Sequence, residues 1–471
     1  MTASVATAGE KTAHASLAEL VRLAGLPASV ADAVTIEPTG PVFPTRYNIE
    51  TPAAAVLAAT GAAAADLWKL KTGRQQQVSV NGRAAAAAMR SSRYLRINGE
   101  RPPEDPENVT GFYPLRDGRW MYLHCNFFNL RDRNVGVLGV SPQREAVAKA
   151  VATWDGVALE TAIFEAGGAC SFVRSEAEWN ALPQAQTVAT LPLFEVVKIG
   201  EAPRKPLPRG DRPLAGIRVL DLTRVLAGPT CARTLAEHGA DVLRITREDL
   251  ADSGPSDFDT GIGKLSAHLD LRNASEAETM RSLIQTCDVF SQSYRPGALA
   301  ARGLSPENLA EMHPGIVYVT LSAWGHEGPW RPRRGYDTVV QSANGMAFHG
   351  EKAQPRFLPV SAQDYVAGYL LAFGTMVALG RRAREGGSWL VRTSLATAGH
   401  WIRGHGLHDP SQYAHLAAEL PADELQSLMG GHDSPIGRLT HLAPVVRMSE
   451  TPPRWTRPAV PRGYHEAVWP E

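Results

Sequence analysis

The sequence predicts an α/β protein: a Rossmann-like, parallel sheet domain together with a second, smaller α+β domain. Two observations lead to this prediction. Short apolar strands alternate with helical segments after residue 206, which is the pattern of successive βαβ units. Before that point, a Gly-containing turn followed by an aromatic-rich segment indicates a different, mixed module. Because ligands of open parallel sheets bind at the carboxyl ends of the strands, we expect the functional residues there.

Length and charge narrow the class of protein. The chain has 471 residues, enough for two or three domains and for a site between them. Lys plus Arg equals Asp plus Glu at 48 each, so there is no overall positive field for collecting nucleic acid. We therefore expect no nucleic-acid partner.

Cysteine and histidine spacing gives no sign of a metal site. The four cysteines are far apart and include no CxxC pair: Cys125, Cys170, Cys231 and Cys287. This excludes a recognisable zinc or disulfide framework and fits the reducing cytoplasm, which is the predicted location. His400 and His405 are five residues apart, whereas a helical metal pair is spaced by four. The prediction is no metal.

Residues 1–40 are expected to form a loose leader. The first twenty contain Glu10 and Lys11 and no apolar block, unlike a secretory signal. The longest uncharged stretch, Tyr365 to Gly380, is shorter than the ~20 residues that span a bilayer as a helix. It is interpreted as a buried core helix, and no membrane partner is expected.

Residues 41–205 are predicted to hold an Ala-rich helix and the small α+β domain. In the segment "RDGRWMYLHC", Asp117 and Gly118 form a turn before a strand. A proline-rich stretch of mixed charge, residues 199–216, disfavours helix and indicates a domain boundary: "IGEAPRKPLPRGDRPLAG".

Residues 206–471 are predicted to form the sheet domain and a C-terminal tail. The expected strands are "IRVLDL", "ADVLRIT", "CDVFSQS" and "GIVYVTLSAWG", and a helix is expected in "AGPTCARTLAEHG". No GxGxxG follows the first strand, so the dinucleotide-binding fingerprint is absent.

The chain also contains a weak internal repeat. Leu57 to Ala87 aligns without a gap with Leu370 to His400, and both read as small-residue helix, basic exit, glycine turn and strand. The aligned pairs are Gly61 with Gly374, Gly73 with Gly386, and Val78 with Val391. At this register Thr51 takes the position of Asp364, so only the second copy carries the acid.

Asp364 is the candidate catalytic residue. It precedes a long, uncharged helix in "LPVSAQDYVAGYLLAFGTMVALGRR". An Asp at this position commonly caps the helix by accepting backbone N–H bonds. Alternatively, a carboxylate held at a helix N-terminus among small neighbours can attack a substrate as a nucleophile. Position alone leaves both interpretations open.

Motifs around Asp364 resemble one enzyme family. They occur in a fixed order between Arg212 and about His400: "PLAGIRVLDLTRVLAGPTCARTLAEHGADVLRI", "GKLSAHLDL", "YRPGALAARGLSPENL", "HPGIVYVTLSAWGHEGPW", "GYDTVVQSANG" and "QDYVAGYLLAFGTMVALGRR". Together they resemble the family III CoA-transferases, which include formyl-CoA transferase, carnitine CoA-transferase and alpha-methylacyl-CoA racemase. The resemblance implies an interlocked homodimer with no permanently bound cofactor, whose substrates are acyl-CoA and a small carboxylic acid.

The resemblance also assigns roles to residues. It implies that Asp364 attacks the thioester to form a mixed anhydride and then exchanges through aspartyl-CoA. The loop "RVLAGP" opens a helix whose N–H groups favour anions, and the expected CoA-binding residues there are Arg224, Ala227, Gly228 and Pro229. By family position the other expected partners are Arg247, Arg295 and Arg302, with Lys264 as a weaker candidate. The alternative for each arginine is an ordinary solvated charge.

The sequence departs from the family pattern in two ways. The racemases have His directly before Asp where this chain has Tyr336 and Asp337, and His326 is a poor substitute, so transfer is favoured over racemisation. The small domain expected after the Asp364 helix instead precedes the sheet, which indicates a rearranged or fused form whose two halves imitate part of the dimer. A catalytically inactive CoA-binding homologue is the third possibility.

Overall fold

The computed structural model describes residues 12–102, 109–250 and 254–470, and its largest sheet has seven strands. Their spatial order is β10 (Lys264–His268), β9 (Asp241–Thr246), β8 (Arg218–Leu222), β11 (Val289–Gln292), β12 (Val317–Ser322), β13 (Ser388–Ser394) and β7 (Phe194–Gly200). All neighbours run parallel except β13 and β7, which are antiparallel. The predicted α/β architecture with a parallel sheet is confirmed.

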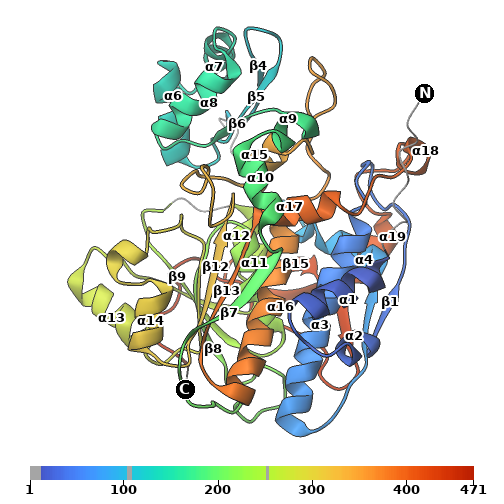
Figure 1. Cartoon of the computed structure of the whole chain (residues 1–471), viewed down its shortest axis with the longest axis vertical. Coiled ribbons are helices and arrows are strands. Elements are labelled where there is room, and N and C mark those ends of the chain that lie inside the picture. The colour runs from blue at the N-terminus through green and yellow to red at the C-terminus, as the bar shows by residue number, and fades with distance from the viewer. Residues whose placement is uncertain (1–11, 103–108, 251–253, 471) are drawn as a thin grey trace.

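Both faces of this sheet are covered by helices. One face packs against α13 (Ala274–Ile284) and α14 (Pro306–Met312), while the other packs against α11 (Ala227–Glu237) and α16 (Ala362–Glu385) (Figure 1). Side chains alternate between the two cores along each strand. Val219 belongs to the α11 and α16 side, and its neighbour Leu220 to the α13 side.

The predicted small α+β module is a separate three-stranded antiparallel sheet with three helices on it. Its elements are β4 (Gly111–Pro114), β5 (Trp120–Leu123), β6 (Cys170–Phe172), α6 (Phe128–Leu138), α7 (Arg144–Val151) and α8 (Gly156–Glu165). The Asp117 and Gly118 turn forms as expected, with Gly118 at φ +81°. The module has a hydrophobic core of its own, and α9 (Glu176–Asn180) and α10 (Pro183–Thr190) lead from it back to β7.

Most of the expected leader is folded, so that prediction is wrong from residue 13 onward. The segment forms α1 (Ala13–Leu23), α2 (Ser29–Asp32) and β1 (Val34–Glu37). Leu17 and Leu20 are 0% exposed because α1 lays its apolar face on α3 (Glu50–Thr72). The apolar residues of α1 occupy only one face of the helix. Polar residues separate them in the sequence, so the helix was not recognised there. Residues 1–11 lie outside the described residues.

The internal repeat corresponds to two structurally equivalent units. The first comprises α3, β2 (Val78–Asn81) and α4 (Gly82–Ala88), and the second comprises α16, β13 and α17 (Leu395–Arg403). β2 lies between parallel β1 and antiparallel β16 (Val446–Met448), as β13 lies between parallel β12 and antiparallel β7. The two long helices pack against each other, α3 in blue and α16 in orange in Figure 1.

The aligned glycines have the same structural role in each unit. A Cβ on Gly61 would lie 2.6 Å from Cγ1 of Val78, and one on Gly374 would lie 2.7 Å from Cγ1 of Val391. These are the valines that the repeat aligned, so each glycine lets its helix approach its strand. Gly73 and Gly386 end the two helices at φ +76° and +78°, in the left-handed region that favours glycine.

The two halves of the chain exchange strands. β7, from the first half, is the edge of the main sheet. In return, β15 (Gly437–Leu442) from the end of the chain pairs with β3 (Arg96–Ile97), next to α5 (Ser91–Tyr94). The other elements beyond residue 404 are α18 (Pro410–Tyr413), α19 (Ala422–Leu428), β14 (Met429–Ser434) and β16. The two halves are therefore in contact, and the rearranged or fused form stays a hypothesis. The division at residue 206 stays a prediction.

Within the described ranges, one helix meets the length and hydropathy of a membrane span. It is α3, with a mean hydropathy of 1.2, and 78% of the apolar window is buried inside the protein. The predicted core helix α16 is also buried over most of its length. Both belong to the same hydrophobic core.

Candidate active site

Asp364 is not the cap of its helix. It is the third residue of α16, and Ser361 at the N-cap makes no side-chain capping bond. Instead Asp337, the first residue of α15 (Asp337–Ala343), accepts the backbone N–H groups of Gln363 at 3.0 Å and Asp364 at 3.1 Å through Oδ2. The capping interpretation of Asp364 is wrong, because a carboxylate 27 residues earlier in the chain already satisfies these donors.

Small residues bring Asp364 to the start of α11. A Cβ on Gly368, one turn beyond Asp364, would lie 2.5 Å from the carbonyl oxygen of Ala227. Only glycine fits there, so α16 crosses close to the loop that follows β8. This contact places Asp364 at the carboxyl edge of the parallel sheet, where ligands of such sheets bind.

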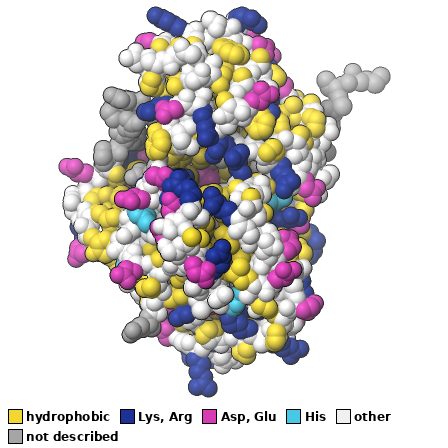
Figure 2. Space-filling view, turned by 90° about the vertical axis from the view of Figure 1, so that its left-hand side faces the viewer, with side chains coloured by type: hydrophobic (Ala, Val, Ile, Leu, Met, Phe, Trp, Pro, Cys, Tyr) yellow, Lys and Arg dark blue, Asp and Glu magenta, His cyan; other side chains and the backbone are white. Residues whose placement is uncertain are grey.

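A cavity of about 350 Å³ opens beside Asp364. Its lining includes one acidic side chain among the described residues, Asp364, and five arginines: Arg224, Arg295, Arg331, Arg333 and Arg334. Its size is in the range of small-molecule sites. Figure 2 shows a hollow where the small module meets the sheet domain, with Lys and Arg side chains gathered around it.

A second cavity of about 310 Å³ adjoins the first, and both are lined by Leu250, Tyr294 and Ala298. It lies at the carboxyl ends of β8 and β9 and contains Arg247, Arg272 and Arg302. The structure thus brings six of the eight predicted site residues to two neighbouring cavities: Asp364, Arg224, Ala227 and Arg295 to the first, Arg247 and Arg302 to the second.

The remaining candidates are structural. Lys264 is 1% exposed, donates to Asp221 at 2.8 Å, and also donates to the carbonyl of Pro229, so its predicted ligand role is wrong. Gly228 and Pro229 are not among the described residues that line the two cavities. A Cβ on Gly228 would lie 2.5 Å from Cβ of Thr223, so this glycine permits the tight turn into α11.

The same turn holds a strained residue. Val225 lines the cavity at φ +74°, a left-handed conformation that β-branched residues rarely adopt. Such conformations cost about 1–3 kcal/mol and persist where the surrounding packing imposes them. Val225 packs against the cluster of Phe127, Leu130 and Ala169 from the small module. The first half of the chain therefore helps to shape the loop at the cavity.

Burial governs the electrostatics of the two carboxyl groups. Burial, and then the negative charge of Asp337, raise the pKa of Asp364 well above its usual range. Burial also raises the pKa of Asp337, to about 6, although its hydrogen bonds oppose this change. The two buried carboxyl groups do not ionise independently, and burial favours the protonated form of each.

The arginines opposite Asp364 leave the cavity strongly positive. Arg334 donates from Nε to the carbonyl of Gly167 at 2.8 Å. Burial, and then the positive charge of Arg295, lower the pKa of Arg334. Arg333 lies 3.4 Å from Oε2 of Glu160, the same oxygen that Arg174 contacts at 2.6 Å. These guanidinium groups form a site for an anion.

The small module contributes to the wall of the cavity. Asn129 at the start of α6 lines the cavity, and the His124 ring stacks on Tyr336 with centroids 4.0 Å apart. Burial lowers the pKa of His124 to about 3, so its imidazole is neutral. Tyr336 stands where the racemases have histidine, and the structure brings an imidazole to it from a distant segment.

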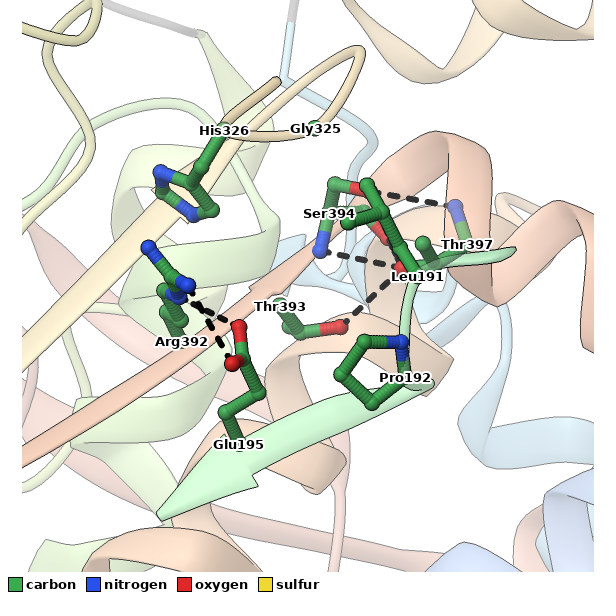
Figure 3. Close-up of a pocket in the computed structure, with 9 residues that line it drawn as sticks. All are labelled: Leu191, Pro192, Glu195, Gly325, His326, Arg392, Thr393, Ser394 and Thr397. Carbon is green, nitrogen blue, oxygen red and sulfur yellow. Dashed lines mark hydrogen bonds and ion pairs between the residues drawn. The ribbon is translucent and has the colours of Figure 1, made fainter. Parts of the chain in front are cut away.

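His326, the upstream histidine, lies elsewhere. It lines a pocket of about 10 Å³, room for a water molecule only, between β7 and β13. Figure 3 shows Arg392 facing the carboxylate of Glu195 there, with His326 on the other side of the guanidinium. This pocket does not reach Asp364.

Sequence reasoning missed the capping role of Asp337 and the arginines of one segment. The segment "RPRRGYD", directly before Asp337, contains Arg331, Arg333 and Arg334. This cluster of positive charge could have indicated an anion site. Among the described residues, no group of three or more His, Cys, Asp or Glu side chains could hold a metal ion.

Comparison with known proteins finds a similarity in the sheet-bearing part of the chain. The model of CoA-transferase family III matches residues 214–426. This segment is similar to CoA-transferase family III. It contains Asp364 and the predicted arginines, and it ends beyond α17.

The relatives carry related names. An acetyl-coenzyme A transferase of Hypoxylon pulicicidum is 28% identical over 71% of this chain and 59% of that protein. The human succinyl-CoA:glutarate CoA-transferase is 33% identical over 36% of this chain and 41% of that protein. The chain thus spans about half the length of these relatives. A solved CaiB/BaiF family protein from Brucella suis is 28% identical, covers 40% of this chain and 55% of that chain, and has a TM-score of 0.37.

Proposed function

We propose that this chain moves CoA between an acyl-CoA and a carboxylic acid, with Asp364 as the nucleophile. One observation carries the proposal: the Asp364 carboxylate is released from capping by Asp337 and lines an arginine-rich cavity at the carboxyl edge of the sheet. The family III match of residues 214–426 and the names of the relatives support the same chemistry.

The proposed reaction has four balanced steps. An oxygen of Asp364 attacks the thioester carbonyl, and the C–S bond breaks to give an aspartyl acyl anhydride and CoA thiolate. The thiolate attacks the aspartyl carbonyl, which releases the first carboxylate and leaves aspartyl-CoA. The acceptor carboxylate then attacks aspartyl-CoA and expels the thiolate. Finally the thiolate takes the new acyl group and regenerates Asp364.

The surroundings of Asp364 suit these intermediates. Its side chain is 9% exposed, which limits the access of water that would hydrolyse an anhydride. The arginines around the cavity offer a field that stabilises thiolate and carboxylate leaving groups. Because only the ionised carboxyl attacks, we expect the rate of acylation to rise with pH through the elevated pKa of Asp364.

The adjoining cavity suits the nucleotide part of CoA. Arg247 and Arg302 extend from the ends of β9 and η1 (Ala300–Arg302), and Arg272 lies with them. Guanidinium groups bind phosphates through paired hydrogen bonds and stack on aromatic bases. CoA lying across Leu250 and Tyr294 would bring its thioester end to Asp364.

Mass spectrometry tests the proposal. The chain is incubated with a panel of acyl-CoAs and treated with hydroxylamine or borohydride, and the peptide containing Asp364 is examined. We expect an adduct on Asp364 that disappears in Asp364→Asn. It should persist in Glu385→Gln, which removes an exposed acid from the same helix. CoA binding without an adduct from any donor would refute the transferase function and favour a binding-only chain.

One observation favours a second function, proton exchange next to the thioester. His124 supplies a neutral imidazole beside Tyr336, and burial raises the pKa of both Asp337 and Asp364, which favours their protonated forms. An isomerase of this kind would exchange the α-hydrogen of a 2-methylacyl-CoA with deuterium from D₂O. It would lose that exchange in His124→Gln. A transferase exchanges none.

Two further predictions concern the whole molecule. The chain is proposed to act in the cytoplasm and to form a homodimer, as the family resemblance implies. The packing of α3 on α16 within one chain supports the hypothesis that its two halves imitate part of such a dimer. Light scattering of the purified chain measures the oligomeric state directly, and a monomer would refute the dimer.

A further inference from the structure

A third cavity, of about 320 Å³, lies outside the site described above. It is enclosed by residues 44–47 before α3, by residues 346–359 between α15 and α16, and by Tyr413. The cavity thus lies where the segments that precede the two long helices α3 and α16 meet. The proposed transfer reaction does not use it.

The charge of this cavity is one-sided. Its lining includes Arg46, Arg356 and His349 and, within the described part of the chain, no Asp or Glu. Arg46 donates from Nη2 to Tyr47 Oη at 3.2 Å and to the carbonyl of Phe348 at 3.1 Å, and neither acceptor carries a charge. Burial, and then both arginines, lower the pKa of His349. Two guanidinium groups without a carboxylate beside them favour an anionic ligand.

The rest of the lining is apolar or aromatic. It consists of Pro44, Tyr47, Met346, Phe357, Leu358, Pro359 and Tyr413, with Thr45 as a further polar group. A cavity with a few convergent polar groups in apolar walls is the usual form of a small-molecule site. Inorganic phosphate alone would leave those walls uncovered, so the matching ligand carries an apolar part.

A chain of hydrogen bonds runs from this cavity to the nucleophile. The N–H of Leu358 donates to Oε1 of Gln341 at 2.9 Å, and Nε2 of Gln341 donates to Oδ1 of Asp337. Oδ2 of Asp337 then accepts the N–H of Asp364. Movement of residues 356–358 thus reaches the carboxyl group that raises the pKa of Asp364.

An aromatic row forms a second connection. Phe357 packs on Tyr122 with ring centroids 4.9 Å apart, and Tyr122 lies beside His124. His124 in turn stacks on Tyr336, which lines the cavity of Asp364. The two cavities therefore share one continuous set of packed side chains.

We propose that the cavity between Arg46 and Arg356 binds a small organic oxyanion, a carboxylate or phosphate with an apolar or aromatic group. We further propose that its occupancy alters the reactivity of Asp364 through Gln341 and Asp337. The binding claim stands on the cavity itself, and the coupling claim rests on the proposed function.

Calorimetry with phenyl phosphate and inorganic phosphate tests the binding claim. Saturating CoA is present throughout to fill the other two cavities. We expect one site per chain that prefers phenyl phosphate, and at least a tenfold weaker affinity in Arg356→Gln, which removes one charge-assisted partner. Arg22→Gln removes an exposed charge from α1 and should bind as the unmodified chain does. No binding, or equal loss in both variants, would overturn the site.

A crystal of the CoA-bound chain soaked in selenate locates the anion. We expect an anomalous peak between the guanidinium groups of Arg46 and Arg356. A selenate peak elsewhere with none here would overturn the assignment.

The coupling claim is tested by the rate of adduct formation on Asp364. We expect saturating phenyl phosphate to change that rate at least twofold, and Arg356→Gln to abolish the change. Gln341→Leu should retain binding and lose the response, since it breaks the hydrogen-bond chain. Binding with an unchanged rate would overturn coupling alone. The absence of any adduct would count against the transferase function and leave the calorimetric result standing.

Discussion

Replacing Asp337 by Asn removes a buried charge next to Asp364 while keeping the side-chain shape. The remaining carbonyl oxygen can still accept the N–H groups of Gln363 and Asp364, which lie at 3.0 and 3.1 Å. The variant loses the ionisable group and also the Oδ1 acceptor of the Gln341 amide, and only the first loss depends on pH. Its stability should therefore differ from that of the unmodified chain in a way that depends on pH.

The magnitude follows from the elevated pKa. Burial raises the pKa of Asp337 from 3.8 to about 6, so its ionisation costs about 3 kcal/mol more in the folded chain than in the unfolded chain. Because the folded chain holds this proton more tightly, the contribution of Asp337 to stability is greatest below pH 4. It falls as the pH rises through about 6. Most of that loss, about 2–3 kcal/mol, develops between pH 4 and pH 8.

Urea unfolding followed by tryptophan fluorescence measures this effect. Both proteins are unfolded at each pH, and the difference in unfolding free energy cancels the titration of groups outside the Asp337 and Asp364 pair. We expect Asp337→Asn to gain about 2–3 kcal/mol relative to the unmodified chain on going from pH 4 to pH 8. Asp364→Asn should change in the same direction, since burial raises that pKa too. A difference that stays constant from pH 4 to pH 8 would refute the reasoning.

The same variant tests the interaction between the two carboxyl groups. Removing the negative charge of Asp337 lowers the pKa of Asp364, because that charge is one of the two causes of its elevation. The pH dependence of adduct formation should then shift to lower pH. An unchanged profile would show that Asp337 does not control the ionisation of the nucleophile.

Three further predictions concern packing and binding. Gly368→Ala places a Cβ 2.5 Å from the carbonyl of Ala227, so we expect a loss of about 1–3 kcal/mol in urea unfolding and a lower rate of adduct formation; an unchanged stability would contradict the close crossing of α16 and α11. Glu160→Gln weakens the buried pair with Arg174, so we expect the free energy of unfolding to fall by about 3–5 kcal/mol in thermal or urea unfolding. An unchanged stability would show that the pair is dispensable. Arg302→Ala should raise the dissociation constant of CoA about tenfold in calorimetry, and an unaltered affinity would place the nucleotide elsewhere.

Much of the sheet domain and part of the site could be predicted from the sequence. Alternating strands and helices predicted the parallel sheet, because the period of apolar residues and the turn residues between them are local features. The resemblance to family III then pointed to Asp364 and Arg247, and the structure places both beside cavities at the carboxyl ends of the parallel strands. The repeat could also be recognised from local features, because Gly61 and Gly374 are smaller than the residues around them in their helices.

Other parts of the site depended on contacts between distant segments. Whether Asp364 caps its helix was decided by Asp337, which the chain reaches only by folding α15 against the start of α16. Lys264 carries the residue type of a phosphate ligand, yet pairing with Asp221 in the core removes it from the site. A side chain shows its chemical type in the sequence, but not its partners.

The sequence by itself determined the family III pattern, the parallel sheet and the candidate nucleophile, because these rest on residue types at fixed local spacings. Only the tertiary structure decided which carboxyl group accepts the capping bonds, how the first half reaches the cavity through Asn129, and which arginines surround it. The physical reason is that burial and charge pairing, which set the pKa of Asp364, are properties of the assembled surroundings of a residue and not of its neighbours in the chain.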